Sequence, residues 1–450
     1  MEIEVLVEQN KWWKKKDSIE EDYDILKWKK GKYRWIPEVL NDIMLKPFSL
    51  HIILGPRQVG KTTAIKLMIK KMLDDKDPRS LFYFNCDEIS DHRELKDVLE
   101  TYLYLKGKWK IKTSYIFLDE ITSPREWYRT IKSMIDLGKF RNDVVVLTGS
   151  SSISIKGETE LFPGRRGHGK NFIFLPLSFR EYLKIHNPEV YKKIRPVKNL
   201  KVEDFEERVS EAMLYKKELD IILKKYFTTG GFPLSIEIEN LADAKNTYLN
   251  WIKTDILKSN RSDTIARQII KSFIGKLSTP ISWEKISREI EVKSPKTVAA
   301  YIELLRSLFS VIVLHHVDIT PDTIKVGKNK KIHVIDPLLL AIFEDWCMVK
   351  LKEKEHITAE SLVATHLARF LTIKYGFSAL DEQIFYWRNK SEIDVIVNDR
   401  GLKGFEVKWT DKFDIKTHPG LKTFMVVSKN KFNTKPLSIP LSVFLSLLDI

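Results

Sequence analysis

The segment that most restricts the fold has the spacing Gly-x-x-x-x-Gly-Lys-Thr and runs from Gly55 to Thr62. It follows the apolar run His51–Leu54 directly and opens a helical stretch that reaches Leu73. Glycines let a backbone fold around a phosphate, and amide groups at a helix N-terminus point toward the anion. A strand, this loop and a helix in that order predict a nucleotide phosphate site. The expected nucleotide contacts are Gly55, Pro56, Arg57, Gln58, Val59, Gly60, Lys61, Thr62 and Thr63.

A second motif supplies the groups that hydrolysis of a nucleoside triphosphate needs. In such loops the lysine, here Lys61, reaches the β- and γ-phosphates, and the hydroxyl of Thr62 binds Mg²⁺. The apolar run Tyr115–Leu118 ends in Asp119 and Glu120. We expect Asp119 to hold the Mg²⁺ and Glu120 to orient or deprotonate the attacking water. An acidic strand end alone is common in turns, but the two motifs together predict ATP hydrolysis with Mg²⁺.

Further apolar runs indicate the fold that carries these motifs. Each run is followed by polar or glycine residues, as expected for strands of a parallel sheet that helices cover on both faces. The runs are His51–Leu54, Leu81–Phe84, Tyr115–Leu118, Val144–Leu147 and Phe172–Leu175. The fold class is therefore α/β.

Two later segments offer contacts to the γ-phosphate. A hydroxyl after the run Val144–Leu147, from Thr148 or Ser150, can lie between the two motifs, although a solvated loop serine is the alternative. Further on, Arg165 and Arg166 lie in a glycine-rich loop. An arginine from a neighbouring subunit often stabilises the charge that develops in phosphoryl transfer. We favour Arg165 for this catalytic role, which implies a homo-oligomer; ordinary surface arginines are the alternative.

Composition excludes several classes of protein. The 450 residues are 43% hydrophobic and 30% charged, which is typical of globular chains with more than one domain. No apolar run approaches the roughly 18 residues that cross a bilayer, and Met1–Glu4 lacks a signal-peptide layout. The two cysteines are far apart and build no disulfide framework. We expect a cytoplasmic protein without a membrane partner.

The net charge of +15 suits a partner with a phosphate backbone, and we expect DNA. Residues 1–47 form a basic, aromatic arm that includes Lys11–Lys16 and Lys27–Trp35. Such a segment can grip phosphates and stack on bases. The alternatives are that the tryptophans dock the arm onto the next domain, and that abundant Lys and Glu reflect a hot environment.

A helix–turn–helix pattern lies between Pro280 and Val317. Trp283, Ile286 and Ile290 share one helix face, and Ser294 begins a second helix as its N-cap. Strand-like segments at 311–317 and 331–335 follow as a wing. A winged helix binds DNA through its second helix, and Lys293, Lys296 and Lys328 would contact phosphates. A winged fold used only for packing or self-association is the alternative.

The C-terminal stretch carries candidate nuclease residues. Residues 391–397 and 404–409 read as a hairpin, in which Asp394 can approach Glu406 and Lys408. Two carboxylates that hold Mg²⁺ beside a lysine form the D…ExK arrangement for phosphodiester cleavage. Glu360, at the start of the preceding helical stretch, is a further candidate ligand for this Mg²⁺.

These motifs together resemble a family of prokaryotic, largely archaeal, P-loop ATPases of the AAA superfamily with a restriction-endonuclease-like C-terminal domain. The resemblance covers about Ile43 to the C-terminus, and the arm lies outside it. It rests on the segments Gly55–Thr63, Phe117–Ile121, Leu147–Ser151, Pro163–Arg166, Leu175–Leu183, Gly230–Pro233, Ser294–Leu305, Tyr386–Val397 and Phe405–Trp409. It implies ATP hydrolysis, a helical lid, a winged helix and a PD-(D/E)xK-like α/β domain without assured activity.

We therefore expect five parts: a basic arm (1–47), a P-loop ATPase core of AAA type (48–180), a helical lid (181–260), a winged helix (261–335) and a restriction-endonuclease-like domain (336–450). The leading hypothesis is an ATPase that binds or remodels DNA. An ATP-regulated, Mg²⁺-dependent DNA nuclease is the first alternative. A signalling or scaffold ATPase with protein partners is the second.

Overall fold

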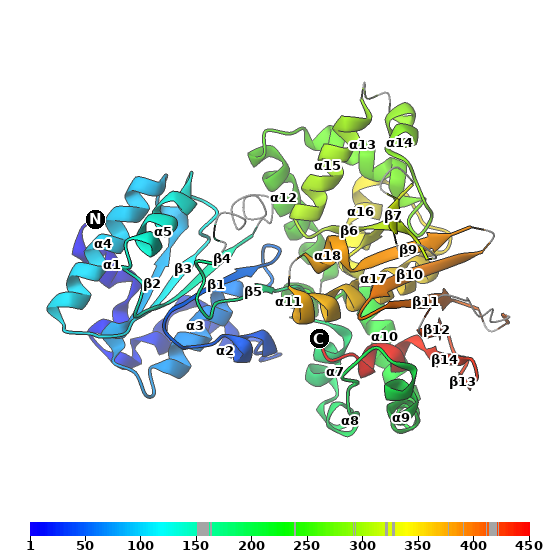
Figure 1. Ribbon diagram of the computed structural model, residues 1–450, viewed down its shortest axis with the longest axis horizontal. Helices are drawn as coiled ribbons and strands as arrows, with labels where there is room; N and C mark the ends of the chain where they lie inside the picture. Colours follow the sequence, from blue (N-terminus) through cyan, green and yellow to red (C-terminus); the bar gives the residue numbers. More distant parts are fainter. Residues whose placement is uncertain are drawn as a thin grey trace. The chain divides into compact units, whose positions relative to one another are not determined.

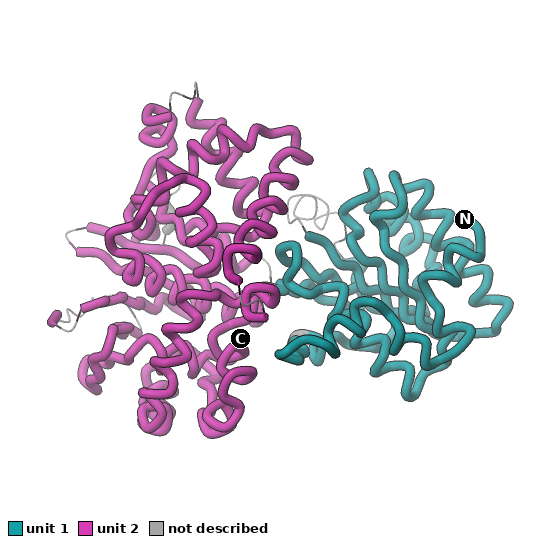
Figure 2. The backbone as a smooth tube through the Cα atoms, turned by 180° about the vertical axis from the view of Figure 1, so that it is seen from behind, with its two compact units in different colours: residues 1–174 teal, residues 175–450 magenta. Residues whose placement is uncertain are grey.

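The computed structural model describes residues 1–150, 162, 164–237, 240–290, 292, 294–319, 323–325, 329–376, 378–389, 391–410, 412–413, 421 and 423–450. They form two compact units, residues 1–174 and residues 175–450 (Figure 2). Ser151, Pro163, Lys293 and Lys328, which the sequence analysis includes in its motifs, lie outside the described residues. Within the described part of the chain, no helix is both long and apolar enough to span a bilayer.

The first unit contains a parallel sheet of five strands in the order β2-β3-β4-β1-β5 (Figure 1). The strands are β1 (Ser49–Leu54), β2 (Leu81–Asn85), β3 (Tyr115–Asp119), β4 (Val144–Gly149) and β5 (Asn171–Ile173). The connecting helices are α3 (Lys61–Met72), α4 (His92–Lys108) and α5 (Trp127–Asp136). The α/β prediction is confirmed, because strands buried on both faces must be nearly continuously apolar.

The N-terminal arm belongs to the same unit. It comprises α1 (Ile3–Gln9), α2 (Tyr23–Lys30) and the short 3₁₀ turns η1 (Lys11–Trp13), η2 (Lys16–Glu21) and η3 (Glu38–Asp42). Trp12 is buried and donates a hydrogen bond to the carbonyl of Leu81, 3.0 Å away. Trp13 bonds to the same carbonyl at 2.9 Å and stacks on Phe82. Docking of the arm, one of the two alternatives from the sequence, therefore accounts for both tryptophans.

The second unit is built on a nine-stranded mixed sheet with helices around it (Figure 1). Its helices up to residue 258 are α7 (Phe179–His186), α8 (Pro188–Lys193), α9 (Val202–Met213), α10 (Lys216–Thr229), α11 (Pro233–Glu237) and α12 (Leu241–Lys258). The later helices are α13 (Asp263–Ile274), α14 (Trp283–Glu289), α15 (Pro295–Ser307), α16 (Pro337–Cys347), α17 (Lys354–Tyr375), α18 (Ala379–Glu382) and α19 (Leu441–Leu447).

The strands of this sheet come from two regions of the sequence. They are β6 (Val311–Asp318), β7 (Thr323–Lys325), β8 (Lys331–Val334), β9 (Ile384–Arg388), β10 (Glu392–Asn398), β11 (Leu402–Lys408), β12 (Thr423–Ser428), β13 (Asn433–Thr434) and β14 (Leu437–Pro440). The expected C-terminal hairpin is present, since β10 and β11 are antiparallel with Asn398 opposite Leu402. The expected wing strands, β6 and β8, are also antiparallel to each other.

Strand pairing crosses the expected boundary between the winged helix (261–335) and the C-terminal domain (336–450). Strand β6 pairs with β8 on one side and runs parallel to β9 on the other, with His316 opposite Tyr386. The wing strands therefore belong to the C-terminal sheet. Strand propensity predicts that a segment is extended, but it does not indicate which sheet the segment joins.

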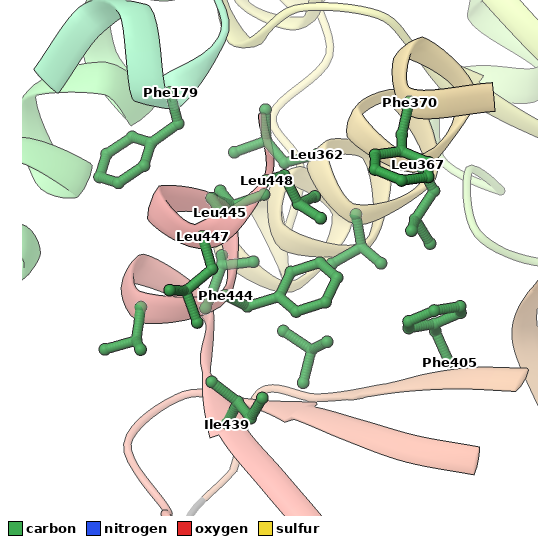
Figure 3. Packing of buried hydrophobic residues seen from close by; sticks show 14 of the residues in the cluster. Phe179, Leu362, Leu367, Phe370, Phe405, Ile439, Phe444, Leu445, Leu447 and Leu448 are labelled. Atoms are coloured by element: carbon green, nitrogen blue, oxygen red, sulfur yellow. The ribbon is translucent and has the colours of Figure 1, made fainter. Parts of the chain in front are cut away.

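The helices expected to form a lid also share a core with the C-terminal sheet. Phe179 lies in one hydrophobic cluster with Leu362, Phe405 and Phe444 (Figure 3). Phe205 belongs to the same cluster. The rings of Phe205 and Phe444 stack with centroids 5.5 Å apart. An amphipathic pattern shows that a helix must bury one face, but the partner is chosen by the tertiary fold.

The break between α10 and α11 has a local cause. A Cβ atom at Gly230, where φ is +63°, would lie 1.9 Å from an oxygen of the buried Asp336. The amide of Gly231 donates to the other carboxylate oxygen of Asp336 at 2.8 Å. The two glycines therefore wrap around a carboxylate that also caps α16.

Candidate functional site

The phosphate loop lies at the carboxyl end of β1, where helix α3 begins at Lys61. Gly60 is the N-cap of that helix and adopts a φ of +97°, which glycine tolerates best. A Cβ atom at Gly55 would lie 1.9 Å from the carbonyl oxygen of Phe174. Both glycines of the motif are therefore required by the backbone, and the loop directs a helix N-terminus at the site.

Lys61 is buried at the base of this loop. Its ammonium donates hydrogen bonds to the carbonyl oxygens of Gly55 and Pro56, each at 2.9 Å. Its Nζ atom also lies 4.0 Å from a carboxylate oxygen of Glu120. These contacts hold the positive charge between the loop and the end of β3.

Asp119 is 2% exposed and accepts hydrogen bonds from three side-chain hydroxyls. The hydroxyl of Thr62 donates to it at 2.6 Å, and the hydroxyl of Thr148 donates to its other oxygen. The phenol of Tyr83 donates to it at 3.1 Å. Burial, with the negative charge of Asp119, raises the pKa of Tyr83 well above its usual value, so this phenol remains a neutral donor.

The oxygen atoms of Thr62 and Asp119 fit a magnesium site. Mg²⁺ prefers hard oxygen ligands and usually takes one or two carboxylates together with substrate phosphates. A hydroxyl and a carboxylate 2.6 Å apart, at the N-terminus of a phosphate-loop helix, provide this donor set. Bound Mg²⁺ would supply neutralisation of phosphate charge there.

Thr148 joins the ends of two neighbouring strands. Besides its bond to Asp119, its hydroxyl accepts a hydrogen bond from the amide of Glu120 at 3.2 Å. The amide of Ile121 donates to the Thr148 carbonyl at 2.8 Å. Glu120 has a φ of +48°, a strained value that this connection holds in place. Of the two hydroxyls considered, Thr148 lies against the acidic motif, and Ser150 is buried two residues beyond it.

Arg165 lies away from the phosphate loop of its own chain. Its Nε donates to a carboxylate oxygen of Asp136 at 2.6 Å. The carbonyl of the next residue, Arg166, accepts from the amide of Leu50, near the start of β1. The loop begins after Leu54, about 13 Å farther along that strand at its usual rise per residue. Any role of Arg165 at a nucleotide therefore requires a second subunit.

A cavity of about 800 Å³ in the second unit holds the expected nuclease residues. Its lining includes Glu360 from α17, Asp394 from β10, and Glu406 and Lys408 from β11. The β9–β10 pairing shifts register between Ile393 and Ile396, and such a bulge re-aims the side chains within it. The four predicted residues are thus brought to one cavity.

Their arrangement is not the expected metal site. The ammonium of Lys331, from β8, lies 2.9 Å from Glu360, 3.0 Å from Asp394 and 2.5 Å from Glu392. Lys408 pairs with Glu406 instead. Among the residues that the structure describes, no three His, Cys, Asp or Glu side chains are arranged to hold a metal ion. Two of the predicted ligands, Glu360 and Asp394, do not fit Mg²⁺ here, because the ammonium of Lys331 already contacts both.

Burial and these charges set the ionisation of the cluster. Burial, with the negative charge of Asp394, raises the pKa of Glu360. Burial would also raise the pKa of Asp394, but Lys331 and the amide of Val407 outweigh it and lower that pKa. Burial and the charge of Lys331 lower the pKa of His333 to about 3, so this imidazole is neutral.

Sequence reasoning missed Lys331, Glu392 and Tyr83. Glu392 lies two residues before Asp394, and this i, i+2 spacing on a strand is a signal that both face one side. Lys331 had no such signal, because it lies in a segment that the pattern placed in the wing. Tyr83 reaches Asp119 because β2 and β3 are neighbours, and the strand order is not readable from the sequence.

Comparisons with known proteins agree with the geometry of the first unit. The family described as "AAA domain" matches residues 48–183. A family described as a domain of unknown function, DUF8612, matches residues 221–348. The uncharacterized protein MJ1544 of Methanocaldococcus jannaschii is 27% identical over 383 residues, which cover 79% of this chain and 74% of that protein.

Solved structures resemble the chain only distantly. The ORC2 protein of Aeropyrum pernix is 11% identical, with a TM-score of 0.35, over 67% of this chain and 88% of that one. The ORC1 protein of the same organism, solved with DNA, is 12% identical, with a TM-score of 0.27, over 66% and 86%. Cdc6p from Pyrobaculum aerophilum is 11% identical, with a TM-score of 0.24, over 76% and 94%. Structural similarity at these TM-scores supports no conclusion about the present chain.

The parallel sheet, the phosphate loop at the end of β1 and the match over residues 48–183 agree with one another. Residues 48–183 of this chain are thus similar to the AAA domain family and carry a phosphate loop at the end of a strand of a parallel sheet.

Proposed function

We propose that this chain hydrolyses ATP with Mg²⁺ and couples the hydrolysis to the binding or remodelling of DNA. The observation that carries the proposal is the contact set around Asp119, in which the phosphate-loop hydroxyl of Thr62 and the strand-end hydroxyl of Thr148 meet one buried carboxylate. In an AAA-type domain this arrangement supplies a metal-binding edge directly beside a phosphate loop.

The roles of the residues follow from their positions. Backbone amides of the loop, which Pro56 does not provide, bind the phosphates, and Lys61 exchanges its contacts with the loop carbonyls for the β- and γ-phosphate oxygens. Thr62 and Asp119 hold the metal ion. Glu120, positioned through its amide by Thr148, orients the attacking water and accepts its proton. Arg165 of a neighbouring subunit stabilises the charge on the transferred phosphoryl group, so the active form is a homo-oligomer.

Loss of the loop lysine tests the proposal. Purified protein should release phosphate from ATP, and Lys61→Ala should reduce turnover to the background level. Lys71→Ala, a substitution of a lysine near the other end of α3, is the matched control and should retain activity. Unchanged turnover in Lys61→Ala would refute the assignment.

The DNA partner is supported by charge and by exposed cations on a helical pair. The net charge is +15. Helices α14 and α15 follow each other as predicted, with Ser294 accepting a hydrogen bond from the amide of Lys296 as the N-cap of α15. Arg288 and Lys296 are exposed. We propose that α13–α15 with β6–β8 act as a winged helix, whose second helix enters a major groove.

DNA binding is tested by its salt dependence. Each phosphate contact releases a counterion, so the logarithm of the affinity should fall linearly with the logarithm of salt concentration. We expect duplex DNA to stimulate the ATPase, and we expect Lys296→Ala to weaken binding at every sequence and to reduce the salt slope. DNA affinity that does not change with salt, together with an ATPase that DNA does not stimulate, would favour the scaffold ATPase that binds proteins.

The ATP-regulated nuclease is a weaker candidate. It is supported by the gathering of Glu360, Asp394, Glu406 and Lys408 at one cavity, which is consistent with a PD-(D/E)xK-like domain. The position of Lys331 argues against a metal-dependent reaction there. A gel assay on duplex, single-stranded and branched DNA, with ATP and Mg²⁺, separates this candidate from the leading one.

A further inference from the structure

We propose that the cavity of the second unit is a divalent-cation site in which a side chain of the same chain, Lys331, takes the place of the metal ion. The cavity then binds neither Mg²⁺ nor Mn²⁺, and three of its acidic side chains, Glu360, Glu392 and Asp394, hold a lysine. This inference concerns the second unit and does not depend on the proposed ATP hydrolysis.

The geometry of Lys331 is that of a central cation. Its Nζ atom lies within 3.0 Å of oxygens from Glu360, Glu392 and Asp394. An ammonium has three N–H donors and no acceptor, so it can give one hydrogen bond to each of three carboxylates. The side chain of Lys331 is fully buried, so the three carboxylates share a cation that solvent does not reach.

Among the described residues, His333, His356 and Arg388 also lie near these carboxylates, but each is farther from them than Lys331 is. Glu360 is 2% exposed; burial and the charge of Asp394 raise its pKa, and the ammonium of Lys331 opposes that rise. The Nε2 atom of His333, on the same face of β8, lies 4.0 Å from a carboxylate oxygen of Glu360. His356 lies 4.0 Å from Glu360 but is partly exposed, and Arg388 contacts Glu392 from outside at 3.4 Å. Lys331 is therefore closer to Glu360 than either histidine is.

The lysine of the nuclease motif does not have this position. Lys408 is 33% exposed and pairs with Glu406 at the rim of the cavity. The central lysine instead comes from β8, whose backbone is fixed by pairing with β6, with Lys331 opposite Leu314. A divalent ion among the same carboxylates would lie within a few ångströms of this fixed ammonium, and like charges at that distance repel strongly in a buried site.

The test is a titration of nucleotide-free, full-length protein with Mn²⁺, followed by electron paramagnetic resonance of the free ion and by calorimetry. Any site at the phosphate loop is unaffected by Asp394→Asn, so the difference between wild type and Asp394→Asn isolates the cavity. We expect this difference to be zero for the wild type. In Lys331→Met we expect one additional Mn²⁺ site, with an affinity for Mn²⁺ at least tenfold higher than that of the wild-type cavity. The double variant Lys331→Met with Asp394→Asn should lose this site.

Lys403→Met is the matched control, because Lys403 is a second buried lysine of the same sheet and is paired with Asp399. It should gain no Mn²⁺ site. Circular dichroism establishes that each variant is folded. A stoichiometric Mn²⁺ site in the wild type that Asp394→Asn removes would overturn the proposal, even if Lys331→Met does not fold. A folded Lys331→Met without a new site would overturn it as well.

Discussion

The side-chain amide of Asn10 forms two hydrogen bonds with the backbone of Tyr83. The Tyr83 amide donates to Asn10 Oδ1 at 2.7 Å, and Asn10 Nδ2 donates to the Tyr83 carbonyl at 2.9 Å. Because β2 is an edge strand, these are groups that a further strand would otherwise bind. The same tyrosine donates its hydroxyl to Asp119. The arm therefore completes the edge of the sheet beside the carboxylate of Asp119.

Replacing Asn10 should destabilise the first unit. Asn10→Ala leaves a buried amide and a buried carbonyl of Tyr83 without these partners, and we expect a loss of about 2 kcal/mol in the free energy of unfolding. Chemical denaturation followed by tryptophan fluorescence measures it. Lys14→Ala, at an exposed position of the arm, is the control and should change little. Equal stabilities of the two variants would contradict the expectation.

Glu120→Gln should separate nucleotide binding from hydrolysis. The amide side chain retains the shape of glutamate but cannot accept a proton from water, so we expect kcat to fall by about 10² to 10⁴-fold. Equilibrium binding of fluorescent ATP should remain close to the wild-type affinity, because Lys61 and Thr62 are unchanged. A variant that turns over ATP normally would exclude Glu120 as the base.

Thr148→Val should lower turnover more than Ser150→Ala does. Valine keeps the volume of threonine but removes the bonds to Asp119 and to the amide of Glu120. We expect kcat to fall about tenfold or more, the effect of roughly one lost hydrogen bond to a charged group. Steady-state kinetics of both variants in parallel measure it. A larger loss of turnover in Ser150→Ala would indicate that Ser150, and not Thr148, supplies the hydroxyl between the two motifs.

Arg165→Ala should be rescued in mixtures with another inactive variant. The second variant is Lys61→Ala. The Arg165→Ala subunit retains Lys61 in its nucleotide site, and the Lys61→Ala subunit retains Arg165, so a mixed oligomer can combine an intact nucleotide site with an intact arginine. We expect each variant alone to be nearly inactive and the mixture to recover measurable turnover. Asp136→Ala removes only the partner of Arg165 and should keep most of the activity, since an exposed ion pair contributes about 0–1 kcal/mol. A mixture without recovery would count against a role in trans.

The stability of the second unit should fall in acid through Asp399. Burial would raise the pKa of this carboxyl, but hydrogen bonds from Lys374, Lys403 and Tyr375 outweigh it and place the pKa well below the usual value. A lowered pKa stabilises the fold above the ordinary value near 4 and loses that contribution as the pH falls below it.

Asp399→Asn should therefore cost about 3 kcal/mol at pH 7, the usual loss when one partner of a buried ion pair is removed, and less at pH 3. Urea denaturation at both pH values measures the difference. Asp345→Asn, which breaks an exposed pair with Lys245, is the control and should show a small effect at either pH. A cost at pH 3 equal to that at pH 7 would contradict the expected titration.

Much of the first unit was predictable because its signals are local. The loop from Gly55 to Thr62, the buried strand before it and Asp119 at the end of β3 each follow from a few adjacent residues. The N-cap Ser294 and the hairpin that carries Asp394 are equally local. The division near residue 335 was not predictable in this way, because the pairing of β6 with β9 joins residues about 70 positions apart.

The sequence by itself therefore determined the strand, loop and helix that form the proposed phosphate site, since backbone geometry and residue spacing within one loop are encoded where they act. Only the tertiary structure decided which distant groups complete each site. Tyr83 reaches Asp119 through the order of the strands, and Lys331 reaches Asp394 through a shared sheet. A buried charge must be compensated by whatever opposite charge the fold brings near it, and that choice is not encoded in any neighbouring residue.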